Sequence, residues 1–490
     1  MNEEPGMQQK GINLDPLFKP QNVAIYEAKD KLSYFFEGFE KLGFPRENLY
    51  LINRHETNIN GFECYKSLQD IPAERIDLVI LAVRREKLIA SLKHILQEKN
   101  IRFIHFFSAG TGESDELGEK IEQEIKTILD KTDTRAIGPN CMGVYCPEGK
   151  NTYSPSFPKE AGNIGLIFHS GDLHTKMIRY GALRYDFKFS KGVSVGNCID
   201  LQISDFLTYF NQDPSIDFIC VYFEGFSKHH PHEGRVLYRA LKSMKKPVLF
   251  LRGGRTERAQ TAVRTHTGSL GTPQKLWNAI FEQTPAIEVS GILDDLLDNA
   301  YLFYEFFKHY GALKLEQQSQ FYPKDKNALA ILWSGGIGIL DTDVLTELGI
   351  KLPQFKGKEL EDLRKVYPLK IGSLSNPLDL PWIVATDIFI NISRAAITEQ
   401  IDVIIIETDS PLYWNEERFE RYYQNLLEIK DYVNSLKKFL ILILPQYPHP
   451  VRQSYYRRLL DDGFIVYPSI RRAGRAFLAL YWFGKKATTD

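Results

Sequence analysis

Apolar runs alternate with amphipathic stretches along the first 130 residues. The apolar runs of strand length lie at 22–26, 49–53, 76–83 and 103–107. The stretches with helical spacing of apolar positions lie at 32–42, 85–99 and 113–130. Strands that alternate with helices in this way predict β-α units and a parallel sheet.

Ligands of such sheets bind at the carboxyl ends of the strands. The residues that follow three of the predicted strands are therefore candidates, namely Glu27-Ala28-Lys29, Asn53 and Ser108-Ala109-Gly110. A segment of turn formers, Ile137-Gly138-Pro139-Asn140-Cys141-Met142-Gly143, closes this part of the chain. A cysteine in such a loop is more often packed than reactive, and the sequence leaves both roles open for Cys141.

The same alternation is repeated twice. Predicted strands at 165–169, 218–223 and 247–251 come with helices at 174–185, 201–210, 272–281 and 292–307. After a polar linker at 315–325, further strands follow at 328–333, 403–407, 439–444 and 463–467, before a closing helix at 471–481. The pattern predicts an α/β chain of three domains, at residues 1–150, 151–318 and 319–490.

Two turns of small residues, Ser170-Gly171 and Ser334-Gly335-Gly336, each open a predicted helix. The free N–H groups and the positive end of the helix dipole suit such a turn to an anion. Many α/β proteins have one such turn, so either turn alone is weak evidence for a phosphate site.

Glu224 and His266 are the candidates for catalysis. Glu224 ends the strand at 218–223 and would face the ligand side of the sheet, although helix capping or a surface ion pair is an alternative. His266 lies in Arg264-Thr265-His266-Thr267-Gly268-Ser269-Leu270-Gly271, which we expect to be a flexible loop. An imidazole is nucleophilic near neutral pH and can carry a phosphoryl group, but an ordinary surface histidine has the same sequence signal.

Composition narrows the functional classes. A chain of 490 residues is too long for one core, and a net charge of −1 gives no reason to expect nucleic acid or an anionic membrane as partner. No apolar run approaches the roughly 18 residues that span a bilayer, and the N-terminus does not resemble a signal peptide. The five scattered cysteines favour a reducing cytoplasm. His229-His230-Pro231-His232 resembles a metal cluster, but a polar turn is the preferred interpretation, so no metal site is predicted.

Short motifs in a fixed order give the chain a family resemblance. They are Leu14-Asp15-Pro16-Leu17-Phe18, Ser108-Ala109-Gly110, Ile137 to Gly143, Ser170-Gly171, Gly196-Asn197, Glu224-Gly225, Gly254-Arg255, His266 to Leu270, Ser334 to Gly338 and Asn376-Pro377-Leu378-Asp379-Leu380. Over nearly its whole length the chain resembles the alpha subunit of nucleoside-diphosphate-forming acyl-CoA synthetases. That family includes ADP-forming acetate–CoA ligase, and succinyl-CoA synthetase is a more distant relative.

The resemblance implies a Rossmann-like CoA-binding domain followed by two flavodoxin-like, succinyl-CoA synthetase-like ligase domains. It implies that His266 is phosphorylated and that Glu224 orients it. It further implies two groups of binding residues: Ser170, Gly171, Gly335, Gly336, Asn140 and Cys141 at phosphate, and Ala28, Lys29, Asn53, Val83, Ser108, Ala109 and Gly110 at CoA. The implied reaction joins a small carboxylic acid to CoA with ATP, reversibly, through an acyl phosphate.

The resemblance also implies a partner. Three predicted domains account for the chain and none is an ATP-grasp module, so we expect a separate ATP-grasp beta subunit that binds ATP or ADP and magnesium in a hetero-oligomer.

The sequence departs from the family pattern at the first strand. Glu27-Ala28-Lys29 replaces the usual Gly-Ala-Ser, which puts a negative charge where a CoA phosphate is expected. Such repulsion costs about 1 to 4 kcal/mol at 4 Å, and Lys29 or Arg54 could offset it. His169 and Asp172 also replace the residues usual beside Ser170-Gly171. A different acyl acceptor, or a non-catalytic or regulatory subunit, therefore remains an alternative.

Overall fold

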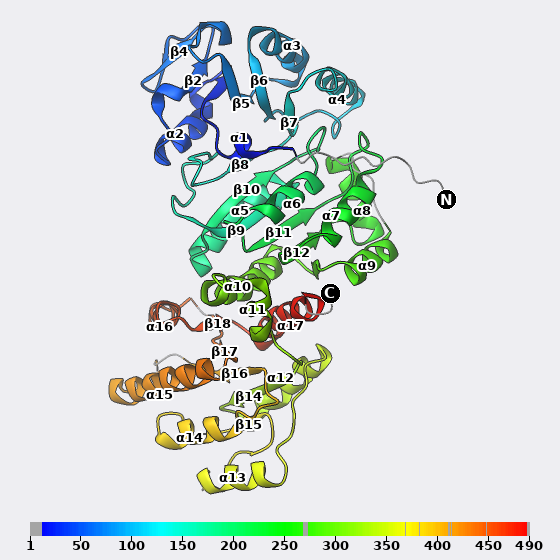
Figure 1. Cartoon of the computed structure of the whole chain (residues 1–490). Coiled ribbons are helices and arrows are strands. Elements are labelled where there is room, and N and C mark those ends of the chain that lie inside the picture. Colours follow the sequence, from blue (N-terminus) through cyan, green and yellow to red (C-terminus); the bar gives the residue numbers. More distant parts are fainter. Residues whose placement is uncertain are drawn as a thin grey trace. The chain divides into compact units, whose positions relative to one another are not determined.

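The computed structural model describes residues 12–267, 273–367, 369–381, 383–409, 412, 414–446 and 448–487, and their side chains except those of 262, 264–267, 315 and 316. The chain forms two compact units, residues 1–297 and residues 298–490. Counted over the described residues, the first unit contains two β-sheets and the second unit contains one (Figure 1). Among the described residues, no helix is long and apolar enough to cross a membrane.

The first sheet has seven strands in the order β3-β4-β2-β1-β5-β6-β7, and only β3 runs antiparallel to its neighbour. Its strands are β1 (Val23–Tyr26), β2 (Leu49–Ile52), β3 (Asn58–Ile59), β4 (Phe62–Tyr65), β5 (Arg75–Leu81), β6 (Asn100–Phe106) and β7 (Arg135–Ile137). Its helices are α1 (Asp15–Phe18), α2 (Ser33–Lys41), α3 (Leu88–Glu98) and α4 (Glu116–Leu129), with short 3-10 helices at Asp30–Leu32, Arg46–Asn48, Leu68–Asp70 and Arg85–Lys87.

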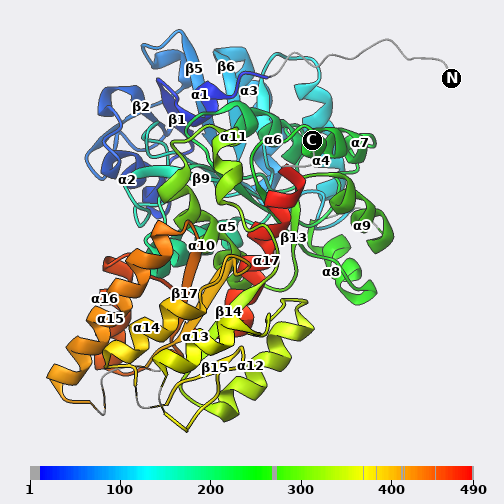
Figure 2. The same ribbon diagram turned by 60° about the horizontal axis from the view of Figure 1, so that its bottom comes forward.

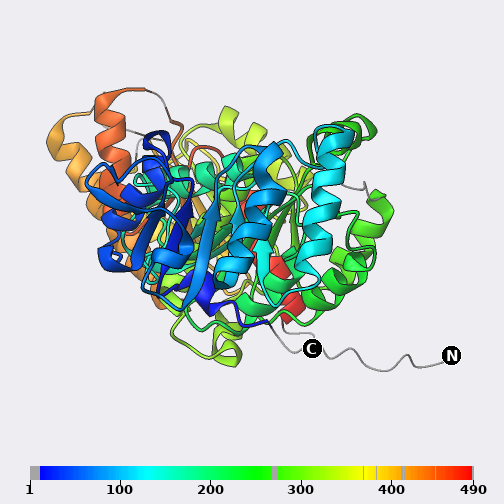
Figure 3. The same cartoon turned by 90° about the horizontal axis from the view of Figure 1, so that it is seen from above.

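The core of this part lies between the sheet and its helices. Val79 of β5 and Ile104 of β6 are fully buried, and Ile95 of α3 and Ile125 of α4 belong to the same cluster. Helices on both faces explain why the central strands are almost continuously apolar. Figure 3 shows α3 and α4, in blue to cyan, side by side over this sheet.

The second sheet has six strands in the order β13-β12-β11-β9-β10-β8, and only β8 is antiparallel to its neighbour. Its strands are β8 (Gly143–Tyr145), β9 (Ala161–Phe168), β10 (Phe189–Ser194), β11 (Phe218–Phe223), β12 (Val248–Arg252) and β13 (Ile287–Val289). Its helices are α5 (Gly171–Tyr185), α6 (Ile203–Gln212), α7 (Glu233–Lys242), α8 (Glu257–Thr267) and α9 (Gln274–Gln283). Helix α10 (Leu293–Tyr310) begins in the first unit and continues into the second.

The sheet of the second unit has five parallel strands in the order β15-β14-β16-β17-β18. They are β14 (Ala328–Leu332), β15 (Leu378–Asp379), β16 (Val403–Glu407), β17 (Phe439–Ile443) and β18 (Ile465–Tyr467). The helices are α11 (Leu315–Gln318), a 3-10 helix at Ser319–Phe321, α12 (Gly335–Glu347), α13 (Lys358–Val366), α14 (Asp387–Ala396), α15 (Glu416–Ser435), α16 (Pro450–Asp461) and α17 (Ile470–Ala487). Helices α13, α14 and α15 are neighbours, and α12 packs against α17 (Figure 2).

The α/β class and the mostly parallel sheets are confirmed. The predicted domain boundaries near residues 150 and 318 stay a proposal, because the compact units divide the chain at Leu297. Strand β8 lies before the first predicted boundary but pairs with β10 of the second sheet.

Candidate active site

The carboxyl ends of both sheets of the first unit border one cavity of about 500 Å³. Loops after β1, β5 and β6 supply one side, and loops after β7, β9, β10 and β11 supply the other. The lining residues are Lys29, Lys31, Leu32, Ala82, Val83, Arg84, Phe107, Ser108, Ala109, Asn140, Cys141, Met142, His169, Ser170, Gly171, Asp172, Gly196, Asn197 and Glu224. The cavity therefore joins most of the predicted CoA residues to the predicted phosphate residues of the first unit.

The loop after β1 is held by ion pairs. Glu27 has the left-handed backbone angle φ of 52°, and its carboxylate lies 3.6 Å from the Lys29 ammonium and 3.3 Å from that of Lys87. The predicted offsetting of the Glu27 charge thus comes from Lys29 and from Lys87. Arg54 takes no part, since its guanidinium lies 2.9 Å from the ring of His94.

Ala28 and Asn53 support this loop from behind. Ala28 is fully buried, and its carbonyl accepts a 2.8 Å hydrogen bond from the amide of Asn53. The Asn53 side-chain oxygen accepts the N–H groups of His55 and Glu56. Neither residue is among those that line the cavity, so the structure gives both a role in shaping the loop.

The loop after β6 lines the cavity only in part. Ser108 donates a hydrogen bond from its hydroxyl to the carbonyl of Val83, which ties the ends of β5 and β6 together. Val83, Ser108 and Ala109 line the cavity, but Gly110 does not. Gly110 has φ of 85°, and its N–H donates to Glu113 at 2.6 Å.

The Asn140-Cys141 segment connects the two sides of the cavity. Asn140 has φ of 59°, and its N–H donates to the carbonyl of Ser108 at 2.9 Å. Cys141 is 4% exposed, and its thiol lies 3.7 Å from the carbonyl oxygen of Phe106. Because burial raises the pKa of this thiol, Cys141 is a packed residue with little thiolate character.

Ser170 and Gly171 begin the 15-residue helix α5 at the cavity. The Ser170 hydroxyl caps the helix by accepting the N–H of Leu173 at 3.3 Å. A Cβ on Gly171 would lie 2.4 Å from Met142, so only glycine fits. Asp172 is paired with Lys176 at 2.6 Å, which offsets the negative charge that departs from the family pattern.

His169 follows β9 and is buried among strand ends. Its ring Nδ1 accepts the backbone N–H of Glu224 at 2.8 Å, and its ring centre lies 5.1 Å from that of Phe223. Burial lowers the pKa of His169 to about 4, although the nearby Glu224 charge opposes this shift. The ring is therefore neutral at physiological pH.

Glu224 stands where the cavity meets helix α8. It is 8% exposed, it lines the cavity, and with Gln260 and Val263 of α8 it borders a gap of about 10 Å³. The expectation of a loop around His266 is wrong for its first part, because α8 continues to Thr267. The His266 side chain and residues 268–272 lie outside the described part of the chain.

Gly335 and Gly336 belong to the second unit, where they open helix α12. Ser334 precedes them at the N-cap without a side-chain hydrogen bond to the helix. A Cβ on Gly335 would lie 3.0 Å from a carboxylate oxygen of Asp379, whose pKa is raised by burial. This second helix N-terminus thus has a carboxyl group beside it.

The residues that line the cavity but were not predicted as site residues include Lys31, Arg84, His169 and Asn197. His169 directly precedes the Ser170-Gly171 motif, and Asn197 belongs to the Gly196-Asn197 motif. Their position in these motifs was the sequence signal that could have identified them. Lys31 lies in the 3-10 helix at Asp30–Leu32, and Arg84 directly precedes the one at Arg85–Lys87. Both are exposed cations, and nothing in the local pattern distinguishes them from other surface charges. Neither forms an ion pair with a described residue, so both can meet an anionic ligand.

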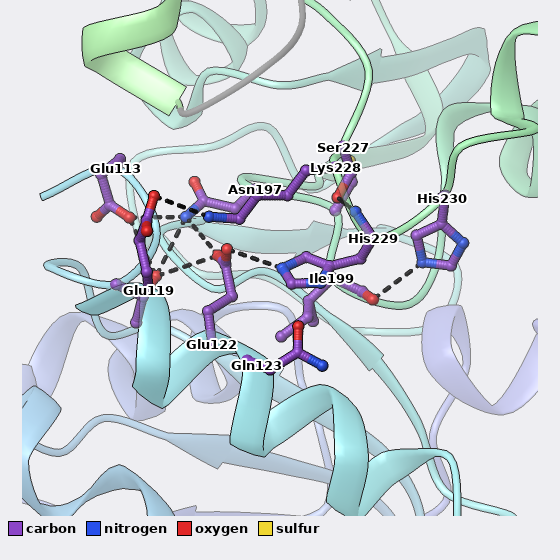
Figure 4. Close-up of polar contacts among 12 residues, drawn as sticks. Glu113, Glu119, Glu122, Gln123, Asn197, Ile199, Ser227, Lys228, His229 and His230 are labelled. Carbon is purple, nitrogen blue, oxygen red and sulfur yellow. Dashed lines mark hydrogen bonds and ion pairs between the residues drawn. The ribbon is translucent and has the colours of Figure 1, made fainter. Parts of the chain in front are cut away.

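Asn197 also connects the cavity to a buried polar network between α4 and the second sheet (Figure 4). Its amide nitrogen lies 2.7 Å from Glu113 and 3.1 Å from Glu122. Burial alone would raise the pKa of Glu113. Its hydrogen bonds, of which the one from Asn197 has the largest effect, hold the pKa below its usual value. Glu122 is 3% exposed, and its other oxygen lies 3.0 Å from the ring of His229.

The remaining contacts of this network explain the histidine-rich segment. The ring of His230 lies 3.0 Å from the carbonyl of Ile199, and Lys228 pairs with Glu119 at 3.1 Å. His229 and His230 thus connect parts of the fold. Within the described ranges, no group of three or more His, Cys, Asp or Glu side chains is arranged to hold a metal ion.

Comparisons with known proteins agree with this architecture. Residues 41–147 match the family described as CoA binding domain, and residues 161–303 match the succinyl-CoA ligase like flavodoxin domain. A solved structure of acetyl-coenzyme A synthetase 1 from Candidatus Korarchaeum cryptofilum, in complex with phosphate and ADP, has the same fold. The TM-score is 0.77 at 22% identity, over 97% of this chain and 98% of that one.

Two relatives from Pyrococcus furiosus identify the family. The chain is 30% identical over 373 residues to the alpha subunit of ADP-forming acetate–CoA ligase II, which covers 75% of this chain and 76% of that protein. It is 29% identical over 491 residues to the alpha subunit of ADP-forming acetate–CoA ligase I, which covers 97% of this chain and 98% of that protein. The chain belongs to the family of ADP-forming acetate–CoA ligase alpha subunits.

Proposed function

We propose that the chain is the alpha subunit of an ADP-forming acyl-CoA synthetase, an acid–thiol ligase. The reaction converts a carboxylic acid, CoA and ATP into acyl-CoA, ADP and phosphate, and it is reversible. One observation carries the proposal: a single cavity joins the loops after β1, β5 and β6 to the N-terminus of α5 and to Glu224. Acyl transfer between phosphate and a thiol needs both sides within one such space.

The phosphoryl group would pass through His266. A nitrogen of phosphorylated His266 gives its phosphoryl group to a carboxylate oxygen of the acid, which forms an acyl phosphate and restores the imidazole. The free N–H groups at Ser170 and Gly171 and the dipole of α5 would stabilise the phosphate charge, which is usually the largest catalytic contribution in such transfers. Glu224 would orient the His266 ring.

CoA would then attack the acyl phosphate. The thiol sulfur forms a bond to the acyl carbon, the carbon–oxygen bond to phosphate breaks, and the thiol proton leaves to solvent or to the departing phosphate. Lys29, Lys31 and Arg84 supply positive charge at the side of the cavity where CoA phosphates would lie. Val83, Ser108 and Ala109 leave room for its narrower thiol-bearing arm.

ATP would be handled by a partner. The relatives in Pyrococcus furiosus are named as alpha subunits, which supports a hetero-oligomer. We assign ATP, ADP and magnesium to an ATP-grasp beta subunit, and we place the assembly in the cytoplasm. The second helix N-terminus, at Gly335 and Gly336, would serve phosphate in the same assembly.

Phosphorylation of His266 tests the proposal. The full chain, together with the neighbouring ATP-grasp subunit, is incubated with ATP and magnesium, and intact mass is measured before and after acid treatment. An acid-labile phosphate that is lost in His266→Ala and reduced in Glu224→Gln is expected. No phosphate, with a partner that binds ATP, would instead favour a non-catalytic subunit, whereas phosphate without CoA turnover would favour another acceptor.

A further inference from the structure

His169 is held at three strand ends of the second sheet. Its backbone N–H donates to the carbonyl of Tyr222 at 3.1 Å, at the end of β11. Its carbonyl accepts the N–H of Gly196 at 3.2 Å, in the segment after β10. Its ring Nδ1 accepts the N–H of Glu224. The imidazole is thus fixed in position before any ligand arrives.

These contacts also fix the tautomer. Because Nδ1 accepts a backbone N–H, it carries no proton, so the proton of the neutral ring lies on Nε2. Nε2 has no partner among the described residues, and the ring lines the cavity beside Ser170 and Gly171. A group with this arrangement cannot act as a general base through either nitrogen, but it can donate one hydrogen bond.

The nearby groups show what would accept that hydrogen bond. Glu224 and Asp172 are the carboxylates that line the cavity, and Lys29, Lys31 and Arg84 are its cations. Asp172 is paired with Lys176, and Glu224 presents its N–H to Nδ1. The position next to the N-terminus of α5 favours an anionic oxygen of phosphate as the acceptor.

We infer that His169 is a positioning residue that donates its Nε2–H to an oxygen of the phosphate or acyl phosphate at the N-terminus of α5. This role rests on the proposed function and deepens it. A neutral donor adds a directed hydrogen bond without a proton that could be lost to the bound anion. It also couples the phosphate to Glu224, since the same ring accepts the Glu224 N–H.

Binding of inorganic phosphate and acetyl phosphate to the purified full chain tests the inference. His169→Gln keeps an acceptor and a donor, whereas His169→Met has a similar length and no donor. We expect His169→Met to weaken phosphate binding about tenfold and His169→Gln to stay within about threefold of the wild type. Melting temperatures identify a variant that does not fold. In that case the inference is tested by the nitrogen-15 NMR spectrum of the wild type.

Nitrogen-15 NMR of the wild-type imidazoles provides the second measurement, with His169→Gln assigning the signal. We expect a neutral Nε2–H tautomer from pH 5.5 to pH 8 and a shift of the Nε2 signal when phosphate is added. A ring that titrates near its ordinary pKa, a proton on Nδ1, or equal phosphate affinity in His169→Met would overturn the inference.

The same data separate this inference from the proposed function. If the wild type binds phosphate and His266 becomes phosphorylated but His169→Met behaves like the wild type, the role of His169 alone is refuted. If the wild type binds neither phosphate nor acetyl phosphate, both are refuted.

Discussion

The charge of Glu27 offers a direct test of how this cavity binds CoA. Glu27 occupies a position where the family pattern has glycine, and it has φ of 52°. Two changes separate its effects: Glu27→Gln removes the charge and keeps the Cβ, and Glu27→Gly removes both. We expect both variants to bind CoA more tightly than the wild type.

The magnitude follows from the ion pairs. The carboxylate is 3.6 Å from Lys29 and 3.3 Å from Lys87, but its side chain is 29% exposed and the two lysine side chains are about half exposed. Each exposed pair contributes roughly 0 to 1 kcal/mol, so its loss has little effect on folding. A freed ammonium at about 4 Å from a phosphate contributes about 1 kcal/mol in water. CoA affinity should therefore rise about threefold to tenfold.

Backbone strain at residue 27 affects the free energy of unfolding. A left-handed conformation costs a non-glycine residue about 1 to 2 kcal/mol. Glycine removes that cost but increases the entropy of the unfolded chain, which offsets about 0.4 to 1 kcal/mol. The unfolding free energies of the Gln and Gly variants should therefore differ by roughly 0 to 1.6 kcal/mol. A larger gain in CoA affinity for Gly than for Gln would show that the Cβ also limits the approach of the ligand.

Calorimetric titration with CoA, in about 20 mM salt and again in about 300 mM salt, measures how the charge and the Cβ of residue 27 each affect CoA affinity. The effect of charge should shrink at high salt, because the Debye length falls well below 10 Å. Glu47→Gln is a matched control, since it makes the same charge change before β2, at the opposite end of the strand from the cavity. Unchanged or weaker CoA binding by Glu27→Gln at low salt would refute the reasoning.

Three further predictions concern buried groups. Burial raises the pKa of Glu233 to about 7, so the native state binds this proton more tightly than the unfolded state, and the free energy of unfolding falls as pH rises from about 4.5 to 7. In urea unfolding, Glu233→Gln should therefore be more stable than the wild type by up to about 3 kcal/mol at pH 8 and by much less at pH 5. Equal gains at the two pH values would contradict this. His229→Ala removes the partner of one oxygen of the buried Glu122, whose other oxygen keeps the hydrogen bond from Asn197, and it should cost about 1 to 3 kcal/mol in the same assay. His232→Ala at an exposed position should cost under about 0.5 kcal/mol. Cys141→Ala should keep acyl-CoA turnover within about threefold, since the thiol is buried; a loss of a hundredfold would reveal a chemical role.

The sequence predicted the elements that have strong local patterns. Strands β1, β2, β5 and β6 are apolar because they are buried on both faces, so the periodicity found them. The hairpin of β3 and β4 was missed, since β3 has only two residues and leaves no run to detect. Strand β8 was missed for another reason: its partner is β10, about 45 residues further along, and pairing of this kind leaves no local signal.

The candidate site shows the same division. Ser170, Gly171 and Glu224 follow predicted strands, and strand ends meet at one edge of a sheet, so their place at the cavity followed from topology. The role of Asn53 did not follow from topology, because its amide donates a hydrogen bond within the protein, to the carbonyl of Ala28. The small residues after His266 predict a loop, but helix α8 continues to Thr267.

The polar network in Figure 4 holds the two sides of the cavity together. Asn197 lines the cavity, and its amide reaches Glu113 and Glu122 of the first sheet's loops and helices, while Glu122 meets His229 from the second sheet. Separating the two sides would expose or orphan several buried polar groups at once, each at a cost of about 1 to 3 kcal/mol. The loops after β1, β5 and β6 and the N-terminus of α5 are therefore held at a fixed spacing by the folded chain itself. A reaction in this cavity would consequently depend on bringing the phosphoryl group to a fixed site, which is the role that the proposal gives to His266.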